Sequence, residues 1–128
     1  MLEHLQFGQN QITSIDVSHI TELDGLYCGG NQLTSIDVSQ NANLRDLEIG
    51  ENKLTELNIS NNVKLNRLCC QYNQLTSLDV SNNTALTELE CNPMNDTNGN
   101  NLLETIYIAN GQVINKLDKP DATNIEEK

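Results

Sequence analysis

The sequence contains no tryptophan and only four aromatic residues in 128, namely Phe7, Tyr27, Tyr72 and Tyr107. Hydrophobic residues make up 37% of the chain, and so few large rings exclude an ordinary mixed core. We expect instead a thin core of many similar aliphatic layers. The commonest residues agree with this, since 20 are Asn and 18 are Leu.

Positive charge is also scarce. Seven Lys and Arg residues stand against 18 Asp and Glu residues, which gives a net charge of −11 at pH 7. Over most of its surface such a protein repels a nucleic-acid phosphate backbone and an anionic lipid surface. We therefore expect neither as a partner.

Long apolar runs are absent as well. No stretch approaches the roughly 18 apolar residues that a membrane-spanning helix needs, and the opening MLEHLQFGQN has no basic start or apolar core typical of a signal peptide. We expect no membrane insertion by this part of the protein. The repeat pattern described next begins at Leu2 with no capping segment before it, so we expect that an upstream segment is missing.

A 21-residue repeat organises the sequence. Every unit opens with the pattern L-x-x-L-x-φ, where φ is apolar, and one complete unit reads LDGLYCGGNQLTSIDVSQNAN. Such self-similarity is the signature of a solenoid, in which each repeat forms one coil. The units begin at Leu2, Leu23, Leu44, Leu65 and Leu86.

The spacing within a unit predicts strands. In L-x-φ the apolar and polar residues alternate, as in a strand that is buried on one side, and the second apolar group has no period long enough for a helix. Stacked in parallel about 4.8 Å apart, the strands would place their apolar residues in ladders inside the coil. The sequence therefore predicts an all-β-rich solenoid with little or no helix, whose core is shared between neighbouring coils.

Three polar positions recur in the units and predict how the coil turns. An Asn at position nine can satisfy the backbone groups of a sharp corner, and the Ser at position seventeen is expected to serve the opposite corner through its hydroxyl. The residue at position fifteen is expected to cap a local turn, with a column of calcium ions as the alternative. These last residues are Asp16, Asp37, Asn58 and Asp79.

The full pattern L-x-x-L-x-L-x-x-N-x-L-x-x-L-D-L-x-x-N-x-x, with Cys, Ile or Phe at the third apolar position, resembles leucine-rich repeats of the short bacterial class called IRREKO. The run NQLTSLDVSNNTALTELEC resembles repeats of surface and secreted proteins of Bacteroidetes and Firmicutes, and more distantly the internalins. The resemblance implies a right-handed coil with a parallel sheet on its concave face. It also implies a protein-binding role and a parent protein that is extracellular or on the cell surface, but no single activity.

The end of the chain departs from the repeat. We expect a solenoid over residues 1–114, with four regular units and one degenerate unit that carries an insertion near residues 92–101. The L-x-x-I-x-I pattern of residues 103–108 is then out of register but is expected to resume the first strand. Residues 115–128 are expected to form a C-terminal cap and a polar tail, with Val113, Ile114 and Leu117 lying across the open end of the stack.

The four cysteines divide into two groups. Cys28, Cys70 and Cys91 share the inward position six and are predicted to be core residues. Cys70 and Cys91 lie on adjacent coils within the Cα range of a disulfide, but side chains in parallel register seldom offer the required dihedral angle, so a disulfide is the less favoured alternative. Cys69 faces the opposite way and is expected to be the accessible thiol. No C-x-x-C spacing indicates a zinc site.

Residue patterns typical of catalysis are missing. His4 and His19 belong to different sides of the first coil, and Cys69 lies three coils from His4, about 14 Å away, which excludes a Cys–His pair. The sequence has no Gly-rich phosphate loop before a helix, no G-x-S-x-G and no H-E-x-x-H. We therefore predict that the chain is not an enzyme and that it has no cofactor and no metal site.

Variation between units indicates where function lies. The outward strand positions carry large and varied side chains, whereas the second side repeats Thr and Ser. We predict a non-catalytic, monomeric recognition module that binds a protein, or a surface glycan, through the concave face; the alternative is a structural spacer, and ice binding by the Thr ladder is a weaker one. The candidate binding residues are His4, Tyr27, Asp46, Glu48, Arg67, Cys69, Tyr72, Glu88 and Glu90.

Tyr27, Arg67 and Tyr72 are the favoured anchors on this face, because aromatic and Arg side chains supply contact area and directed hydrogen bonds. Glycines near Tyr27 are expected to leave a bare strip that a partner fills. The alternative is that Tyr27 simply covers the gap that they leave. These glycines are Gly8, Gly25, Gly29, Gly30 and Gly50.

Overall fold

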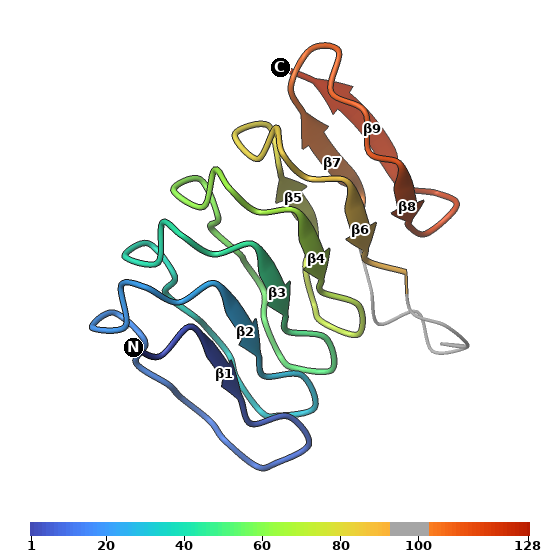
Figure 1. Cartoon of the computed structure of the whole chain (residues 1–128). Helices are drawn as coiled ribbons and strands as arrows, with labels where there is room; N and C mark the ends of the chain where they lie inside the picture. Colours follow the sequence, from blue (N-terminus) through green and yellow to red (C-terminus); the bar gives the residue numbers. More distant parts are fainter. Residues whose placement is uncertain (93–102) are drawn as a thin grey trace.

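The structure, a computed structural model, describes residues 1–92 and 103–128 and shows a stack of coils (Figure 1). The described residues contain no helix, and hence none that could cross a membrane. Each coil contributes short strands. They are β1 (His4–Gln6), β2 (Gly25–Tyr27), β3 (Asp46–Glu48), β4 (Arg67–Cys69), β5 (Ser77–Asp79), β6 (Glu88–Glu90), β7 (Thr105–Ile108), β8 (Lys116–Asp118) and β9 (Asn124–Glu127).

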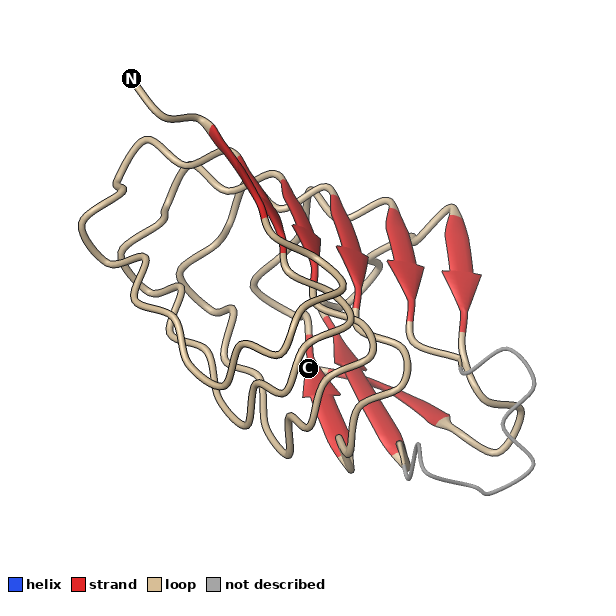
Figure 2. Cartoon of the chain, turned by 90° about the horizontal axis from the view of Figure 1, so that it is seen from below, coloured by secondary structure: helices blue, strands red, loops and turns tan. Residues whose placement is uncertain are grey.

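One parallel sheet runs along one side of the stack, and a second, shorter parallel sheet lies on the opposite side of the C-terminal coils (Figure 2). The first sheet has the order β1-β2-β3-β4-β6-β8, and the second has the order β5-β7-β9. From β1 to β6 the pairing in the first sheet follows the repeat, so that Leu26 pairs with Leu47 and Leu47 with Leu68. The predicted parallel β-solenoid is therefore confirmed.

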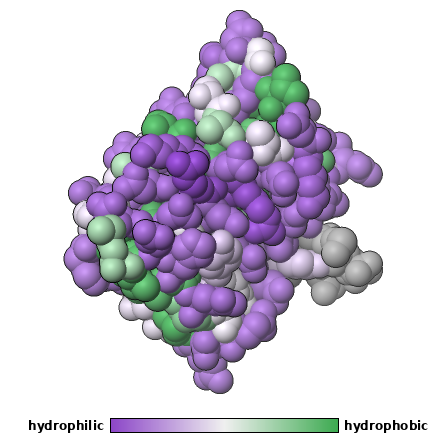
Figure 3. All heavy atoms as spheres, in the orientation of Figure 1, coloured by the Kyte–Doolittle hydropathy of each residue, from purple (hydrophilic) through white to green (hydrophobic). Residues whose placement is uncertain are grey.

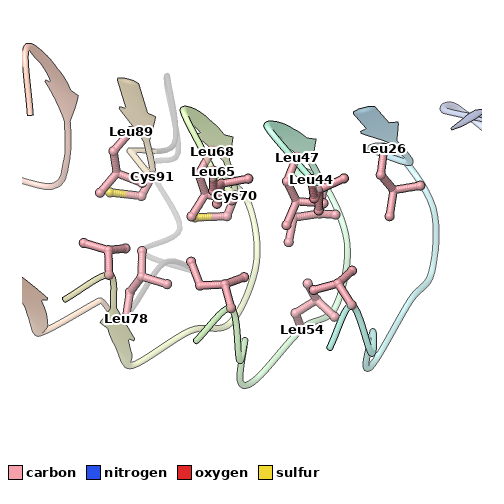
Figure 4. Close-up of a cluster of buried hydrophobic side chains, with 14 of the residues drawn as sticks. Leu26, Leu44, Leu47, Leu54, Leu65, Leu68, Cys70, Leu78, Leu89 and Cys91 are labelled. Carbon is pink, nitrogen blue, oxygen red and sulfur yellow. The ribbon is translucent and has the colours of Figure 1, made fainter. Parts of the chain in front are cut away.

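Aliphatic ladders fill the space between the two sides (Figure 4). Leu47 behind the first sheet and Leu54 from the other side are both fully buried, as are their counterparts in the neighbouring regular coils. Because the ladder residues of one coil pack against those of the next, no coil could bury its apolar side chains alone. The inward register predicted for Leu47 and for Cys28, Cys70 and Cys91 is confirmed.

The asparagines at position nine hold the corner after the first strand, as predicted. The side-chain amide of Asn52 donates to the carbonyl oxygens of Ile49 at 3.0 Å and of Cys28, one coil earlier, at 3.1 Å. Its Oδ1 accepts the backbone N–H of Leu33 at 3.0 Å. Asn31 and Asn73 make the same kinds of bond, so this ladder ties each coil to the preceding one.

A second asparagine ladder, at position nineteen, holds the opposite corner. Asn62 donates to the carbonyl oxygens of Val38 at 3.0 Å and of Asn41 at 2.9 Å, and Asn41 and Asn83 make equivalent bonds. All three side chains are fully buried, and their Oδ1 atoms accept no hydrogen bond from the described residues. The position-seventeen serine hydroxyl was predicted to serve this corner, but the buried carboxamides reach its carbonyl oxygens. The serine hydroxyl donates instead to the position-fifteen side chain, as from Ser60 to Oδ1 of Asn58 at 2.8 Å and from Ser81 to Oδ1 of Asp79 at 2.6 Å.

The residues at position fifteen cap local turns, as predicted. Oδ1 of Asp37 accepts the backbone N–H of Ser39 at 2.9 Å, and Asn58 accepts that of Ser60 at 3.1 Å. Hydrogen bonds from Ser39 hold the pKa of Asp37 below its usual value, and those from Ser18 do the same for Asp16. In the part of the chain that the structure describes, no group of three acidic, His or Cys side chains could hold a metal ion.

The last coils differ from the predicted register. Strand β7 (Thr105–Ile108) pairs with β5 in the second sheet, whereas the pattern of residues 103–108 was expected to resume the first strand. The first sheet continues instead through β8, whose Leu117 pairs with Leu89, and β9 extends the second sheet beyond β7. Residues 93–102, which include most of the expected insertion, lie outside the described residues, and the boundary at residue 114 stays a prediction.

Candidate binding face

Twelve outward residues of six strands form what we call the first-sheet face. Backbone alternation turns the leucines of these strands inward and the residues on either side of each leucine outward. In the view of Figure 3 the surface is mostly hydrophilic, with a few separate hydrophobic areas. One row of the face holds His4, Gly25, Asp46, Arg67, Glu88 and Lys116, and the other holds Gln6, Tyr27, Glu48, Cys69, Glu90 and Asp118.

Arg67 lies at the centre of an ion-pair network on this face. Its Nη1 is 3.1 Å from Oδ1 of Asp46 and 3.6 Å from Oε2 of Glu48, while its Nε is 3.7 Å from Oε2 of Glu88. The carboxylates come from the strands on both sides of β4. Four of the predicted binding residues are therefore brought together, and the guanidinium of Arg67 is already engaged within the protein.

Tyr27 lies over the glycine of its own strand. A Cβ atom built on Gly25 would be 2.9 Å from two atoms of the Tyr27 side chain, so only glycine leaves room for the ring here. The Tyr27 hydroxyl donates to Oδ2 of Asp46 at 3.2 Å. Burial and the Asp46 carboxylate together raise the pKa of Tyr27. At Gly25, therefore, the Tyr27 ring fills the space that the glycine leaves, as in the alternative considered from the sequence.

Cys69 is not the accessible thiol that the sequence predicts. Only 1% of the residue is exposed, although it lies on the outward side of β4. Its strand neighbours are Glu48 and Glu90, and the thiol is hydrogen-bonded to the Glu90 carboxylate. Burial raises the pKa of Cys69 to about 12. Alternation fixed the direction of the side chain, but longer neighbouring side chains determine whether solvent reaches it.

The remaining predicted residues lie at the margins of the network. Nε2 of His4 is 3.5 Å from Oδ1 of Asp24, and the centroid of the His4 ring is 6.3 Å from that of the Tyr27 ring. Nζ of Lys116 donates a hydrogen bond to Oε1 of Glu90 at 2.5 Å. This bond lowers the pKa of Glu90. Neither Asp24 nor Lys116 was among the predicted residues, because one lies just before its strand and the other belongs to a stretch without the repeat pattern.

Tyr72 lies in the turn after β4 and outside the Arg67 network. Its φ angle of 57° falls in the left-handed region, which favours glycine. The same turn position is left-handed in the three preceding coils, at Gln9, Gly30 and Glu51. Position eight is therefore set by the turn, and Tyr72 projects from a corner rather than from the strand face.

A hollow of about 450 Å³ lies between the first-sheet face and this corner. The glycines at position seven contribute to its lining, and a Cβ atom on Gly8 or Gly29 would lie 3.1 Å from the carbonyl oxygen of the next coil. Gly25 and Gly30, by contrast, are covered by Tyr27 and Gln9. The lining residues are Gln6, Phe7, Gly8, Gln9, Asn10, Tyr27, Gly29, Glu48, Gly50, Glu51 and Gln71.

The lining of the hollow is polar and acidic. Its polar side chains are the amides of four Gln and Asn residues, the carboxylates of Glu48 and Glu51 and the hydroxyl of Tyr27. No Lys, Arg or His lines it, and no nucleophile is paired with a base there. Sequence reasoning missed Glu51 and Gln71; the signal for Gln71 was that it replaces the glycine of the three preceding coils at position seven.

Comparison with known proteins identifies the type of repeat. No protein-family model matches the chain, and the comparison with curated proteins gave no match. Among solved structures, the functional domain of InlJ from Listeria monocytogenes shares 39% sequence identity, with a TM-score of 0.70 over 84% of this chain. The chain is an internalin-like leucine-rich repeat solenoid. This confirms the resemblance inferred from the sequence.

A second internalin supports the fold alone. The internalin InlF from Listeria monocytogenes strain 4b F2365 is 24% identical over 94% of this chain, with a TM-score of 0.61. This internalin-like chain spans 25% of the InlJ structure and 35% of the InlF structure. The match therefore concerns a stack of repeats within longer proteins.

Cysteines contribute to the interior of this internalin-like solenoid. The InlJ domain is described as including a cysteine ladder. Here Cys28, Cys70 and Cys91 occupy one inward row, which Ile49 interrupts, and all three are buried. Burial raises the pKa of Cys28 and Cys91 to about 12. In this chain Cys28 and Cys70 act as small apolar groups within the core, whereas the Cys91 thiol donates to the backbone carbonyl oxygen of Asp118 at 3.2 Å.

Proposed function

We propose that the chain is a non-catalytic recognition module that binds a protein through the first-sheet face, the face predicted to be concave. One observation carries the proposal. The outward residues of the first sheet differ from coil to coil and form a connected polar network around Arg67. On the second side the exposed position-twelve residue is threonine in all four regular coils, at Thr13, Thr34, Thr55 and Thr76.

The internalin-like repeat supports this proposal, and it supports an extracellular or cell-surface location for the parent protein. A protein partner suits the face better than a small ligand, because its polar groups extend over strands from all the coils. Protein interfaces are rich in Tyr and Arg, which are among the side chains that this face offers.

A photocrosslinking experiment tests which face is used. A benzophenone amino acid replaces Glu88 on the first-sheet face or, as the matched control, Thr55 on the second side. The protein is then irradiated with extracellular and cell-surface fractions from the surroundings of the source organism. We expect a discrete protein adduct from position 88 and none from position 55, with the adduct lost in a Tyr27→Ala/Arg67→Ala background that retains the circular dichroism melt of the folded chain.

The other results each have a meaning. An adduct from position 55 alone would move the binding site to the second side. Adducts from neither position would favour the structural spacer. An adduct that forms only with glycan-bearing proteins and disappears after deglycosylation would make a surface glycan the ligand.

A further inference from the structure

We infer that the hollow beside Tyr27 receives the guanidinium of an arginine side chain presented by the protein partner. This inference rests on the proposed function and specifies the chemistry that the partner must offer.

The hollow is a product of the backbone. Gly8, Gly29 and Gly50 occupy position seven in three successive coils, where the carbonyl oxygen of the next coil approaches closely. In the fourth coil Gln71 takes this position, and a Cβ atom on Gly50 would lie 2.9 Å from its side-chain amide. No side chain therefore covers Gly8 or Gly29, and Gln71 bounds the hollow at Gly50, which suits a single long side chain.

Charge around the hollow selects the occupant. The Glu48 carboxylate has Oε2 3.6 Å from Arg67, while Oε1 lies on the Gly29 side, 3.8 Å from a Cβ atom built there. Glu51 is exposed and has no ion-pair partner among the described residues. Arg67, the cation nearest to Glu48 in that network, does not line the hollow. The lining therefore carries two carboxylates with no cation, and a positive group complements it.

Hydrogen bonding favours arginine over lysine. Oε1 of Gln71 is buried and accepts no hydrogen bond from the described residues. A buried acceptor without a donor is costly, so the complex is stabilised if the Gln71 amide, which lines the hollow, turns its Oε1 toward a ligand N–H. The guanidinium carries five N–H donors in a planar fork, enough to reach Gln71 and both carboxylates, and it can stack against a ring such as that of Tyr27. An ammonium offers three donors at one point.

A titration followed by NMR tests this inference without the natural partner. The probe is the capped tripeptide Gly-Arg-Gly, added to the ¹⁵N-labelled chain, with Gly-citrulline-Gly as a ligand of similar shape that has no charge. We expect saturable shifts of the Gly8, Gly29 and Gly50 amides and of the Gln71 side-chain amide. Citrulline should bind about fivefold more weakly, the factor expected when two partly exposed charge pairs are lost.

Matched variants isolate the carboxylates. The Glu48→Gln/Glu51→Gln variant should lower the affinity for the arginine peptide about fivefold. The Glu22→Gln/Glu56→Gln variant changes the net charge equally, at exposed residues that do not line the hollow, and should leave the affinity unchanged. Equal binding of both peptides, equal loss in both variants, shifts confined to other residues or no saturable shift would each overturn the inference.

The experiments distinguish a failure of the arginine inference from a failure of the proposed protein-binding function. If the position-88 adduct persists in the Glu48→Gln/Glu51→Gln variant and the arginine peptide does not bind, the face still recognises a protein but the hollow does not take arginine. Saturable binding of N-acetylglucosamine at the same glycine amides, with none by the arginine peptide, would replace the guanidinium by a sugar.

Discussion

The two long sides of the solenoid differ in what changes along the stack. On the first side the outward residues vary at every coil, whereas on the second side threonine and an Asp or Asn turn cap recur. Both sides nevertheless rest on the same buried ladders. The comparison teaches that repeated residues build the coil and that varied residues are the ones free to serve recognition.

The strongest test of the shared interior replaces one ladder residue on each side. Leu47→Ala and Leu54→Ala should each lower the free energy of unfolding by about 2–5 kcal/mol, because both leave a cavity walled by neighbouring coils. Circular dichroism melts and denaturant titrations measure this. A much smaller loss for Leu54→Ala would mean that the second side is not integral to the core.

The burial of Cys69 on the first side can be tested with a thiol reagent. In the native protein at pH 8, all four cysteines should resist a thiol reagent until unfolding, because burial raises the pKa of Cys69 to about 12 and leaves few thiolates. Mass spectrometry of time points identifies the labelled residue. Glu90→Ala removes a covering neighbour and should speed the labelling of Cys69 alone. Rapid native labelling of Cys69 would show that the face is open there.

The corners allow a finer comparison. Asn52→Ala should cost about 1–3 kcal/mol, because it leaves the buried N–H of Leu33 without its acceptor. The carbonyl oxygens of Cys28 and Ile49 lose one of their donors but keep those from Asn31 and Asn73. Asn62→Ala should cost less, because the Asn62 side chain donates but accepts nothing from the described residues. Chemical denaturation ranks the two variants. The opposite order would mean that the Oδ1 atom of Asn62 has a partner in solution.

The smallest effect concerns the turn caps of the second side. Because the folded-state pKa of Asp16 and Asp37 is lowered, their stabilisation is present above the unfolded pKa of about 3.9 and is lost as the pH falls through the folded pKa. The Asp16→Asn/Asp37→Asn variant should keep the turns, as Asn58 does naturally, and lose part of this acid sensitivity. Melts between pH 6 and pH 3 compare the two proteins; identical pH profiles would contradict it.

Periodicity predicts the first sheet well, since a 21-residue repeat aligns every leucine with its counterpart in the next coil. The corner role of Asn52 could also be predicted, because a carboxamide both donates and accepts. Asn62 carried the same signal at position nineteen, where Asn41 and Asn83 also occur. That ladder was missed because the serine two positions earlier offered a simpler explanation.

Two other features could not be read from the pattern. The L-x-x-I-x-I of residues 103–108 fits a strand on either side of the coil, because both sides alternate apolar and polar residues, and only the pairing of β7 with β5 decides between them. The burial of Cys69 depends on the lengths of side chains 21 residues away in both directions. The hollow likewise exists only because glycines from three coils meet.

The asparagine ladders have a mechanical consequence. Each asparagine at position nine bonds within its own coil and to the coil before it, so load applied to the two ends of the chain passes from coil to coil. Under a stretching force the solenoid would therefore unfold from its ends, one coil after another, instead of in a single cooperative step. Each released coil would add 21 residues of extended chain, about 70 Å, so the stack would lengthen in uniform steps.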